Sequence, residues 1–193
     1  MVNVRLKESV KKEGIEWIKA FGIGLIIFVF IRAFFISNYV VEGKSMEPTL
    51  ENGNKLIVNK ISYQIGELNR FDVIVFHHNK EEDFVKRIIG LPGDKVEYRN
   101  DELYINGKKI EEPYLEKQRE EAFGSKLTGD FTLLEKWNVE TVPEGKLFVL
   151  GDNRLESWDG RHFGFISVDQ VDAYGFHLNI FFLTTVSIGA IRR

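Results

Sequence analysis

No cysteine occurs in this sequence, so a disulfide framework and a zinc site built from thiolates are both excluded. An excess of positive charge is also missing, because 29 acidic side chains outnumber 26 basic ones and the net charge is -3. Nucleic-acid binding requires a basic face that neutralises phosphates, and we therefore expect no nucleic acid among the partners. At 193 residues the chain suits one domain of ordinary size.

Long apolar runs are also scarce, and the one that occurs lies near the N-terminus. Residues 20–31 read AFGIGLIIFVFI, and the wider segment 17–36 supplies the roughly 20 residues that a membrane-spanning helix needs. We predict a single transmembrane anchor at 17–36, with Trp17 at the interface and residues 1–16 as a cytoplasmic segment. A buried internal helix and a cleavable signal peptide are the alternatives, but Ser37–Val40 offers no small-x-small cleavage pattern.

The basic side chains around this segment predict its orientation. Five precede or begin it, namely Arg5, Lys7, Lys11, Lys12 and Lys19, and only Lys44 and Lys55 follow closely. Basic residues tend to stay on the cytoplasmic side of a membrane segment. We therefore expect a single-pass protein of the plasma membrane, in contact with lipid, whose residues 37–193 form a domain on the outer face.

The rest of the chain has the short apolar runs that are typical of strands. They occur at Tyr39–Val41, Lys55–Asn59, Phe71–His77, Phe84–Ile89 and Lys146–Leu150. Asn100-Asp101 and Asn106-Gly107 interrupt the segment 96–110, which predicts consecutive hairpins with a tight turn at Asn106-Gly107. No long helix is expected after the anchor, and the polar stretch at about 111–144 is interpreted as an insertion. The predicted fold class is therefore mostly β, with antiparallel strands.

A serine has an unusual setting just after the predicted anchor. Ser45 lies between the flexible Gly43 and the turn-forming Pro48 in the sequence GKSMEPTL. Taken alone, such a serine usually belongs to an ordinary turn. Its candidacy as a nucleophile therefore depends on a base elsewhere in the chain.

Two adjacent cations, Lys86 and Arg87, interrupt an apolar strand. Side chains alternate along a strand, so Lys86 shares one face with Phe84 and Ile88 while Arg87 lies on the other. Apolar surroundings disfavour the ammonium form and lower the pKa of a lysine, which makes Lys86 a candidate general base. A guanidinium stays protonated and cannot take this role.

An alternative gives both cations purely structural roles. In it, Lys86 reaches solvent from an edge strand. Arg87 then pairs with Asp83 or Asp94.

A polar loop follows the last predicted strand named above. Residues 151–161 read GDNRLESWDGR, and Asp159 and Arg161 can form a charge-assisted pair that braces the loop beside a site. An ordinary turn with surface ion pairs is the alternative. The segment from Arg70 to Phe76, by contrast, is interpreted as a plain core strand.

Histidine-based chemistry finds little support in the sequence. His77 and His78 are adjacent, so a strand points them to opposite faces, and His162 and His177 are distant. No set of metal ligands is therefore predicted. A Ser-His-Asp triad stays open, although no histidine has a setting that suggests activation.

Taken in order, these segments resemble the type I signal peptidases of bacteria, over most of the chain. The resemblance is carried by the N-terminal anchor, the GKSMEPTL segment, the RFDVIVF strand, the KRIIGLPGD strand and turn, and the GDNR loop. The single anchor and the short length are similar to the Gram-positive branch of that family. The resemblance implies an antiparallel β catalytic domain at 37–193, preceded by one transmembrane helix.

The resemblance also implies roles for individual residues. Ser45 would attack the scissile carbonyl and Lys86 would act as its base, while Ser157 would orient the lysine amine. Asp159 and Arg161 match structural ion-pairing positions of the family.

Three parts of the chain need separate comment. The family binds the oxyanion with the nucleophile's own N–H and a donor two residues earlier, which here is Gly43 and offers only a backbone N–H. The family usually has serine where this chain has Gly160, and it usually has Gly-Lys-Ala and then an aromatic-Pro pair where this chain has 171–176. The apolar segment 180–191 could lie in the membrane interface or form a final strand.

We therefore expect a serine endopeptidase that removes N-terminal signal peptides from preproteins through an acyl-enzyme, without metal or cofactor. Preprotein signal peptides and membrane lipid are the expected partners, and no obligate protein partner is evident. One alternative is a catalytically inactive, membrane-tethered binding protein on the same scaffold, against which the presence of both Ser45 and Lys86 argues. A self-cleaving Ser-Lys repressor relative would need a DNA-binding region in place of the anchor.

Overall fold

The computed structural model describes residues 2–59 and 68–174. The chain divides into two compact units, Met1–Ser37 and Asn38–Arg193. Helix α1, Val2–Phe35, makes up nearly all of the first unit. Over the described ranges, no helix combines the length and the hydropathy that crossing a membrane requires.

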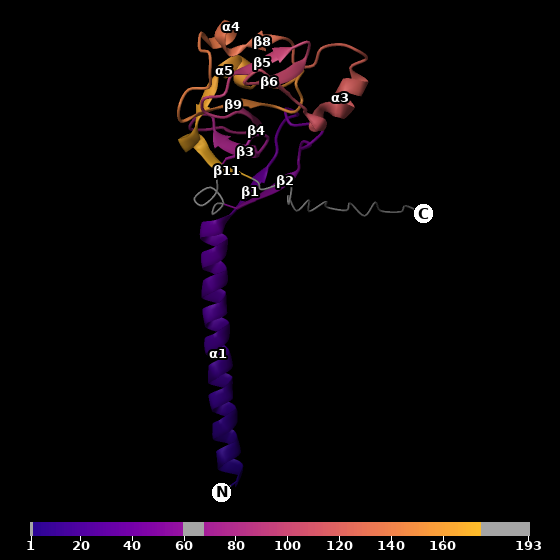
Figure 1. Ribbon diagram of the computed structural model, residues 1–193. Coiled ribbons are helices and arrows are strands. Elements are labelled where there is room, and N and C mark those ends of the chain that lie inside the picture. The colour runs from indigo at the N-terminus through magenta and orange to yellow at the C-terminus, as the bar shows by residue number, and fades with distance from the viewer. Residues whose placement is uncertain (1, 60–67, 175–193) are drawn as a thin grey trace, which may run out of the picture. The chain divides into compact units, whose positions relative to one another are not determined.

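Antiparallel strands dominate the second unit (Figure 1). Its largest sheet has the strand order β10-β9-β4-β3-β11, and a second sheet has the order β7-β6-β5-β8. Every neighbouring pair in these two sheets is antiparallel, and a further pair joins β1 to β2. The predicted antiparallel β fold is thus confirmed.

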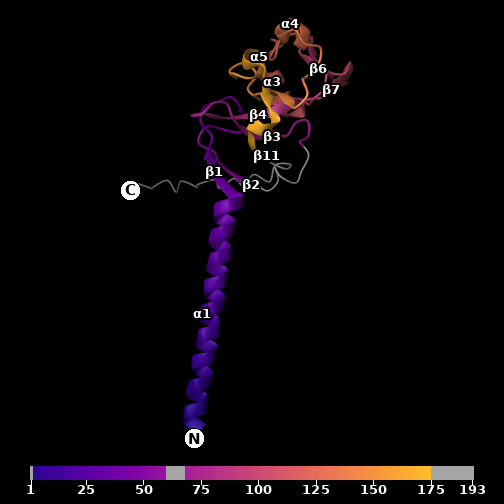
Figure 2. The same cartoon turned by 90° about the vertical axis from the view of Figure 1, so that its left-hand side faces the viewer.

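The strands have the following bounds: β1 Ile36–Val40, β2 Lys55–Asn59, β3 Val73–His77, β4 Asp83–Gly90, β5 Val96–Arg99, β6 Glu102–Ile105, β7 Lys108–Ile110, β8 Phe131–Thr132, β9 Lys146–Leu150, β10 Phe165–Ser167 and β11 Val171–Tyr174. The helices of this unit are η1 Pro113–Leu115, α3 Glu116–Glu121, α4 Leu133–Trp137, α5 Gly160–Phe163 and η2 Val168–Gln170. Helices α4 and α5 lie at the end of the unit opposite β2 in both views (Figure 1, Figure 2). The predicted apolar segment 180–191 lies outside the described residues.

The hairpins β5–β6 and β6–β7 follow directly from their turn residues. Asn100 and Asp101 have φ angles of 51° and 65°, and Asn106 and Gly107 have φ angles of 53° and 79°. Two successive positive φ angles match the right-handed twist of the flanking strands, and Asn, Asp and Gly adopt them most readily. The hairpins predicted over 96–110 are therefore confirmed.

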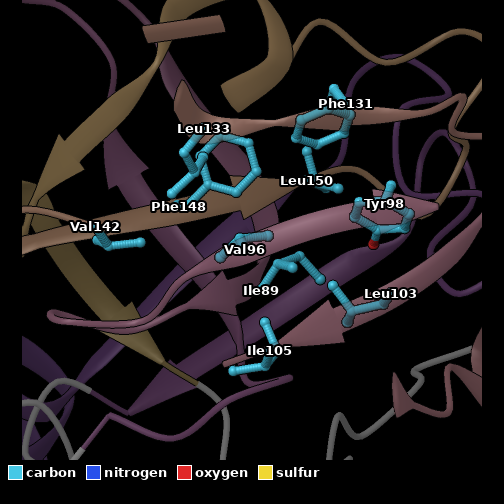
Figure 3. Packing of buried hydrophobic residues seen from close by; sticks show 10 residues of the cluster. All are labelled: Ile89, Val96, Tyr98, Leu103, Ile105, Phe131, Leu133, Val142, Phe148 and Leu150. Carbon is cyan, nitrogen blue, oxygen red and sulfur yellow. The ribbon is translucent and has the colours of Figure 1, made fainter. Parts of the chain in front are cut away.

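The main hydrophobic core lies where the second sheet packs against the large one (Figure 3). Burial alternates along β5 and β6, so every second side chain faces inward. The ten buried members of this cluster are Ile89, Val96, Tyr98, Leu103, Ile105, Phe131, Leu133, Val142, Phe148 and Leu150. Their packing holds β4, which carries Lys86, and β9, which precedes the polar loop 151–161, against the rest of the unit.

The polar stretch at about 111–144 takes part in this core. It forms η1, α3, β8 and α4, and three of its apolar side chains, Phe131, Leu133 and Val142, belong to the buried cluster. Thr132 caps α4 in a capping box with Glu135. The few apolar residues of this stretch are therefore enough to fix its position against the sheets.

A fully buried polar network connects the same stretch to the loop after β9. The Arg154 guanidinium lies 2.6 Å from Glu112 and also donates to the Tyr98 and Thr128 hydroxyls at 2.9 Å and 2.8 Å. Its Nε donates to Gly151 O at 3.0 Å. Burial raises the pKa of Tyr98 well above its usual value, so its hydroxyl stays protonated and donates to Glu112.

Candidate active site

The turn that carries Ser45 is held on the core by the side chains after it. Met46 and Leu50 are fully buried with Val41, Leu56 and Val75, and Leu50 N–H donates to Met46 O at 2.9 Å. Burial of these apolar side chains thus fixes the turn on the core. The side chain of Ser45 stays half-buried at its edge.

Lys86 lies on β4, an interior strand of the large sheet, with Ile74 of β3 as its register partner. Its side chain is 4% exposed, and its Nζ is 2.6 Å from Ser45 Oγ. The alternative in which Lys86 reaches solvent from an edge strand is wrong, because β9 and β3 cover both edges of β4. The structure therefore brings together a serine and a lysine that lie 41 positions apart in the sequence.

The surroundings of Lys86 change its acidity. Burial lowers the pKa of its amine to about 8, although the charges of Asp159 and Asp152 oppose this change. A lysine with this pKa is substantially neutral in mildly alkaline solution. Its nitrogen can then accept a proton from the hydroxyl beside it.

Arg87 pairs with Asp152, a residue that neither interpretation of the sequence proposed as its partner. Its guanidinium makes two hydrogen bonds to Asp152, at 2.8 Å and 2.6 Å, and both side chains are buried. The pairing with Asp83 or Asp94, which the structural alternative proposed, is wrong. Asp94 instead pairs with Arg70 at 2.9 Å. In the antiparallel pairing of β4 with β9, Arg87 lies opposite Leu150, the residue before the polar loop begins. Asp152 of that loop is therefore within reach of the Arg87 guanidinium.

That polar loop holds the turn of Ser45 through its main chain. Asn153 N–H donates to Ser45 O at 3.0 Å, and Asn153 Nδ2 donates to Lys44 O at 3.1 Å. A methyl group on Gly151 would lie 2.1 Å from Ser157 Oγ and 2.4 Å from Ser45 O. Only glycine lets the loop approach the nucleophile this closely.

Gly151→Ala should therefore lower kcat by about 10-fold to 100-fold, because the added methyl group displaces the Ser45 main chain. Peptide cleavage measured well below the unfolding temperature checks this. Gly22→Ala is the control, since nothing lies within 4 Å of a methyl group at that position. An unchanged kcat for Gly151→Ala would mean that the turn absorbs the clash without moving Ser45.

Ser157 is close to this region but is not bonded to the lysine. Its hydroxyl oxygen is buried, and no described residue meets it with full hydrogen-bond geometry. Asp159 is near enough for the hydroxyl to stabilise the carboxylate. The structure thus places Ser157 beside Gly151 and Asp159, without a hydrogen bond to Lys86.

Asp159 and Arg161 form an ion pair that closes the polar loop. Arg161 Nη2 is 2.9 Å from Asp159 Oδ2 and also donates to Arg154 O. Burial raises the pKa of Asp159, but the hydrogen bonds and charge of Arg161 and the Gly151 N–H outweigh this effect and lower it overall. Asp159 therefore stays ionised and keeps the loop closed.

Gly160, where the related family usually has serine, is tightly enclosed. A methyl group there would lie 2.7 Å from Val149 O and 2.9 Å from the Phe148 ring. Phe148 belongs to the main core, so it has little room to retreat. In this chain the position accommodates only glycine without rearrangement.

Gly43 has a φ angle of 89°, which favours glycine. Its N–H donates to Asn52 Oδ1 at 2.9 Å. The backbone donor expected to face an oxyanion is therefore engaged by a side chain in this structure. The sequence around Asn52 carries no signal for this role, because an Asn before a Gly normally indicates only a turn.

The described residues contain no cluster of three or more acidic or histidine side chains that could hold a metal ion. His77 lies 2.5 Å from Asp83, and the ring of His78 stacks on Phe84. His77 ends β3 and His78 follows directly after it, so both lie away from the Ser45 turn in sequence. Because His78 lies outside the strand, the expectation that a strand points the two histidines to opposite faces does not apply, and the two rings simply contact different residues.

Comparison with known proteins agrees with the geometry. Residues 14–176 match the family described as Signal peptidase, peptidase S26. This chain belongs to that family. The resemblance to bacterial type I signal peptidases inferred from the sequence is thereby confirmed, and with it the assignment to the peptidases.

Individual relatives are also similar over much of the chain. Signal peptidase I of Bacillus caldolyticus is 56% identical over 161 residues, which are 83% of this chain and 87% of the relative. Signal peptidase IB of Staphylococcus aureus is 46% identical over 165 residues, which are 83% of this chain and 86% of the relative. The crystal structure of a signal peptidase I from Enterococcus faecalis is similar with a TM-score of 0.55 and 44% identity, covering 58% of this chain and 99% of that one.

Proposed function

We propose that this protein removes signal peptides from preproteins with a Ser45–Lys86 dyad. The observation that carries the proposal is the 2.6 Å separation of Ser45 Oγ and the buried Lys86 amine, whose pKa is lowered to about 8. Neutral Lys86 takes the hydroxyl proton as Ser45 attacks the scissile carbonyl, and then gives a proton to the departing amine. A water molecule, activated by the same lysine, hydrolyses the resulting acyl-enzyme. No metal or cofactor takes part.

The remaining site residues have supporting roles in this proposal. The N–H groups of Ser45 and Gly43 bind the oxyanion, which requires the substrate oxygen to replace Asn52 Oδ1 at the Gly43 N–H. Ser157 orients the Lys86 amine, a role that rests on the resemblance to the family. Asp159 and Arg161 brace the loop, as their ion pair allows.

We also propose that residues 17–36 anchor the protein in the plasma membrane, with the catalytic domain on the outer face. The family consists of membrane-associated enzymes, and basic residues are concentrated before this segment. Large apolar side chains of α1 are more than half exposed, including Phe21, Ile23, Ile26, Phe28 and Phe30. Contact with lipid would remove this apolar surface from water.

The dependence of activity on pH tests the dyad. Because Lys86 must be neutral, kcat/KM should rise about tenfold per pH unit below its pKa and level off above about 8. The measurement uses a peptide without groups that titrate in this range, and far-UV circular dichroism at each pH checks that the protein stays folded. A midpoint near 6.5, the usual value of histidine, would contradict a lysine base.

A further inference from the structure

Gln118 connects the two loops that hold the candidate site, although it belongs to neither. It lies on α3, in the stretch whose sequence predicts a polar insertion. Its Nε2 donates to Glu47 O at 2.9 Å and to Asp152 O at 3.0 Å. Glu47 comes two residues after Ser45, and Asp152 belongs to the polar loop. One side-chain amide therefore ties the nucleophile's turn to the loop beside it.

These contacts require a nitrogen that carries at least two N–H bonds, and the Gln118 amide supplies one without charge. Both acceptors are main-chain carbonyls, so a side chain serves them together only if one atom carries two N–H bonds. Glutamate has the same shape, but its carboxylate offers no donor when ionised and would place negative charge against two carbonyl oxygens. Gln118→Glu therefore removes the connection while it preserves side-chain size.

The position of Gln118 complements the other contacts of the turn. Asn153 binds the main-chain oxygens of Lys44 and Ser45, which fixes the turn at and before the nucleophile. Gln118 fixes it after the nucleophile. Without that contact the turn after the nucleophile loses its hydrogen bond to α3, and Ser45 Oγ can move away from its 2.6 Å contact with the Lys86 amine.

Loss of Gln118 should displace the turn without unfolding it, because buried Met46 and Leu50 still hold it on the core. A displacement of about 1 Å in a reacting group can cost about 100-fold in rate. We infer that Gln118 is a positioning residue for Ser45 in the reaction proposed above, on which this inference rests.

The test compares Gln118→Ala and Gln118→Glu with the parent in single-turnover cleavage. The full-length protein in detergent is used in saturating excess over a fluorogenic peptide with Ala before the cut and two residues further back. The limiting rate constant should fall by about 10-fold to 100-fold in both variants. This constant does not depend on the fraction of folded enzyme, whereas partial unfolding would only raise the half-saturating enzyme concentration.

Two neighbours on α3 supply matched controls. Lys117→Gln changes the net charge by the same amount as Gln118→Glu, and Glu120→Ala truncates an exposed side chain as Gln118→Ala truncates a partly buried one. Both should keep the parent's limiting rate constant. An unchanged limiting rate constant in the Gln118 variants, or one lowered equally in the controls, overturns the inference. Full activity of Ser45→Ala would instead overturn the proposed function, so the two failures are distinguishable.

Discussion

Lys86→Arg should reduce kcat/KM for signal-peptide cleavage by at least about 10³-fold, even though it keeps the positive charge. The arginine guanidinium stays protonated at every working pH and cannot accept the proton of Ser45. Lys86→Ala should be equally inactive. Because the nucleophile and the base act as one unit, the double variant Ser45→Ala, Lys86→Ala should resemble either single variant.

The chain contains a second contact between a lysine and a serine, which supplies the control. Lys146 Nζ bonds to Ser167 Oγ across β9 and β10. Lys146→Arg and Ser167→Ala should therefore keep nearly normal turnover. Steady-state cleavage of a peptide, together with circular dichroism of each variant, measures both pairs. Turnover by folded Lys86→Arg within tenfold of the parent would contradict the dyad.

Local rules were enough to predict part of the fold. The Asn106-Gly107 turn depends only on the φ angles that its two residues tolerate, and the structure has it at the predicted place. Strand alternation likewise separates Lys86 from Arg87, because the side-chain period of a strand is 2. The contact between Lys86 and Ser45 does not follow from either rule. That pairing was predicted only from the resemblance to the family, which rests on several segments that occur in the same order along the chain.

Partners that come from distant parts of the chain could not be predicted in this way. The structural alternative paired Arg87 with a nearby aspartate, but Asp152, 65 positions away, reaches it through the pairing of β4 with β9. Gln118 had no local signal at all, because its acceptors are main-chain carbonyls that any sequence provides. The polar composition of 111–144 indicated only an insertion, because a few apolar side chains, too few to form a pattern, are enough to attach this stretch to the core.

The network around Arg154 should be the most sensitive part of that attachment. Arg154 and Glu112 are 1% exposed each, and their side chains meet at 2.6 Å. Arg154→Leu should lower the free energy of unfolding by about 3–5 kcal/mol, because it removes the buried cation from a buried carboxylate and leaves that carboxylate the longer contact with Arg119. Urea unfolding of the full-length protein in detergent, with the midpoint and slope compared, measures this loss.

Arg119 provides the matched control, because it contacts the same carboxylate, at 3.3 Å, from a side chain that is 34% exposed. Arg119→Leu should cost no more than about 1 kcal/mol, since the Arg119 side chain is partly exposed and the buried carboxylate keeps its shorter contact with Arg154. Adding Glu112→Gln to Arg154→Leu should restore part of the stability, because the neutral amide still accepts from the Tyr98 hydroxyl and carries no charge to desolvate. Equal losses for Arg154→Leu and Arg119→Leu would show that the buried pair holds the 111–144 stretch no more firmly than a surface contact does.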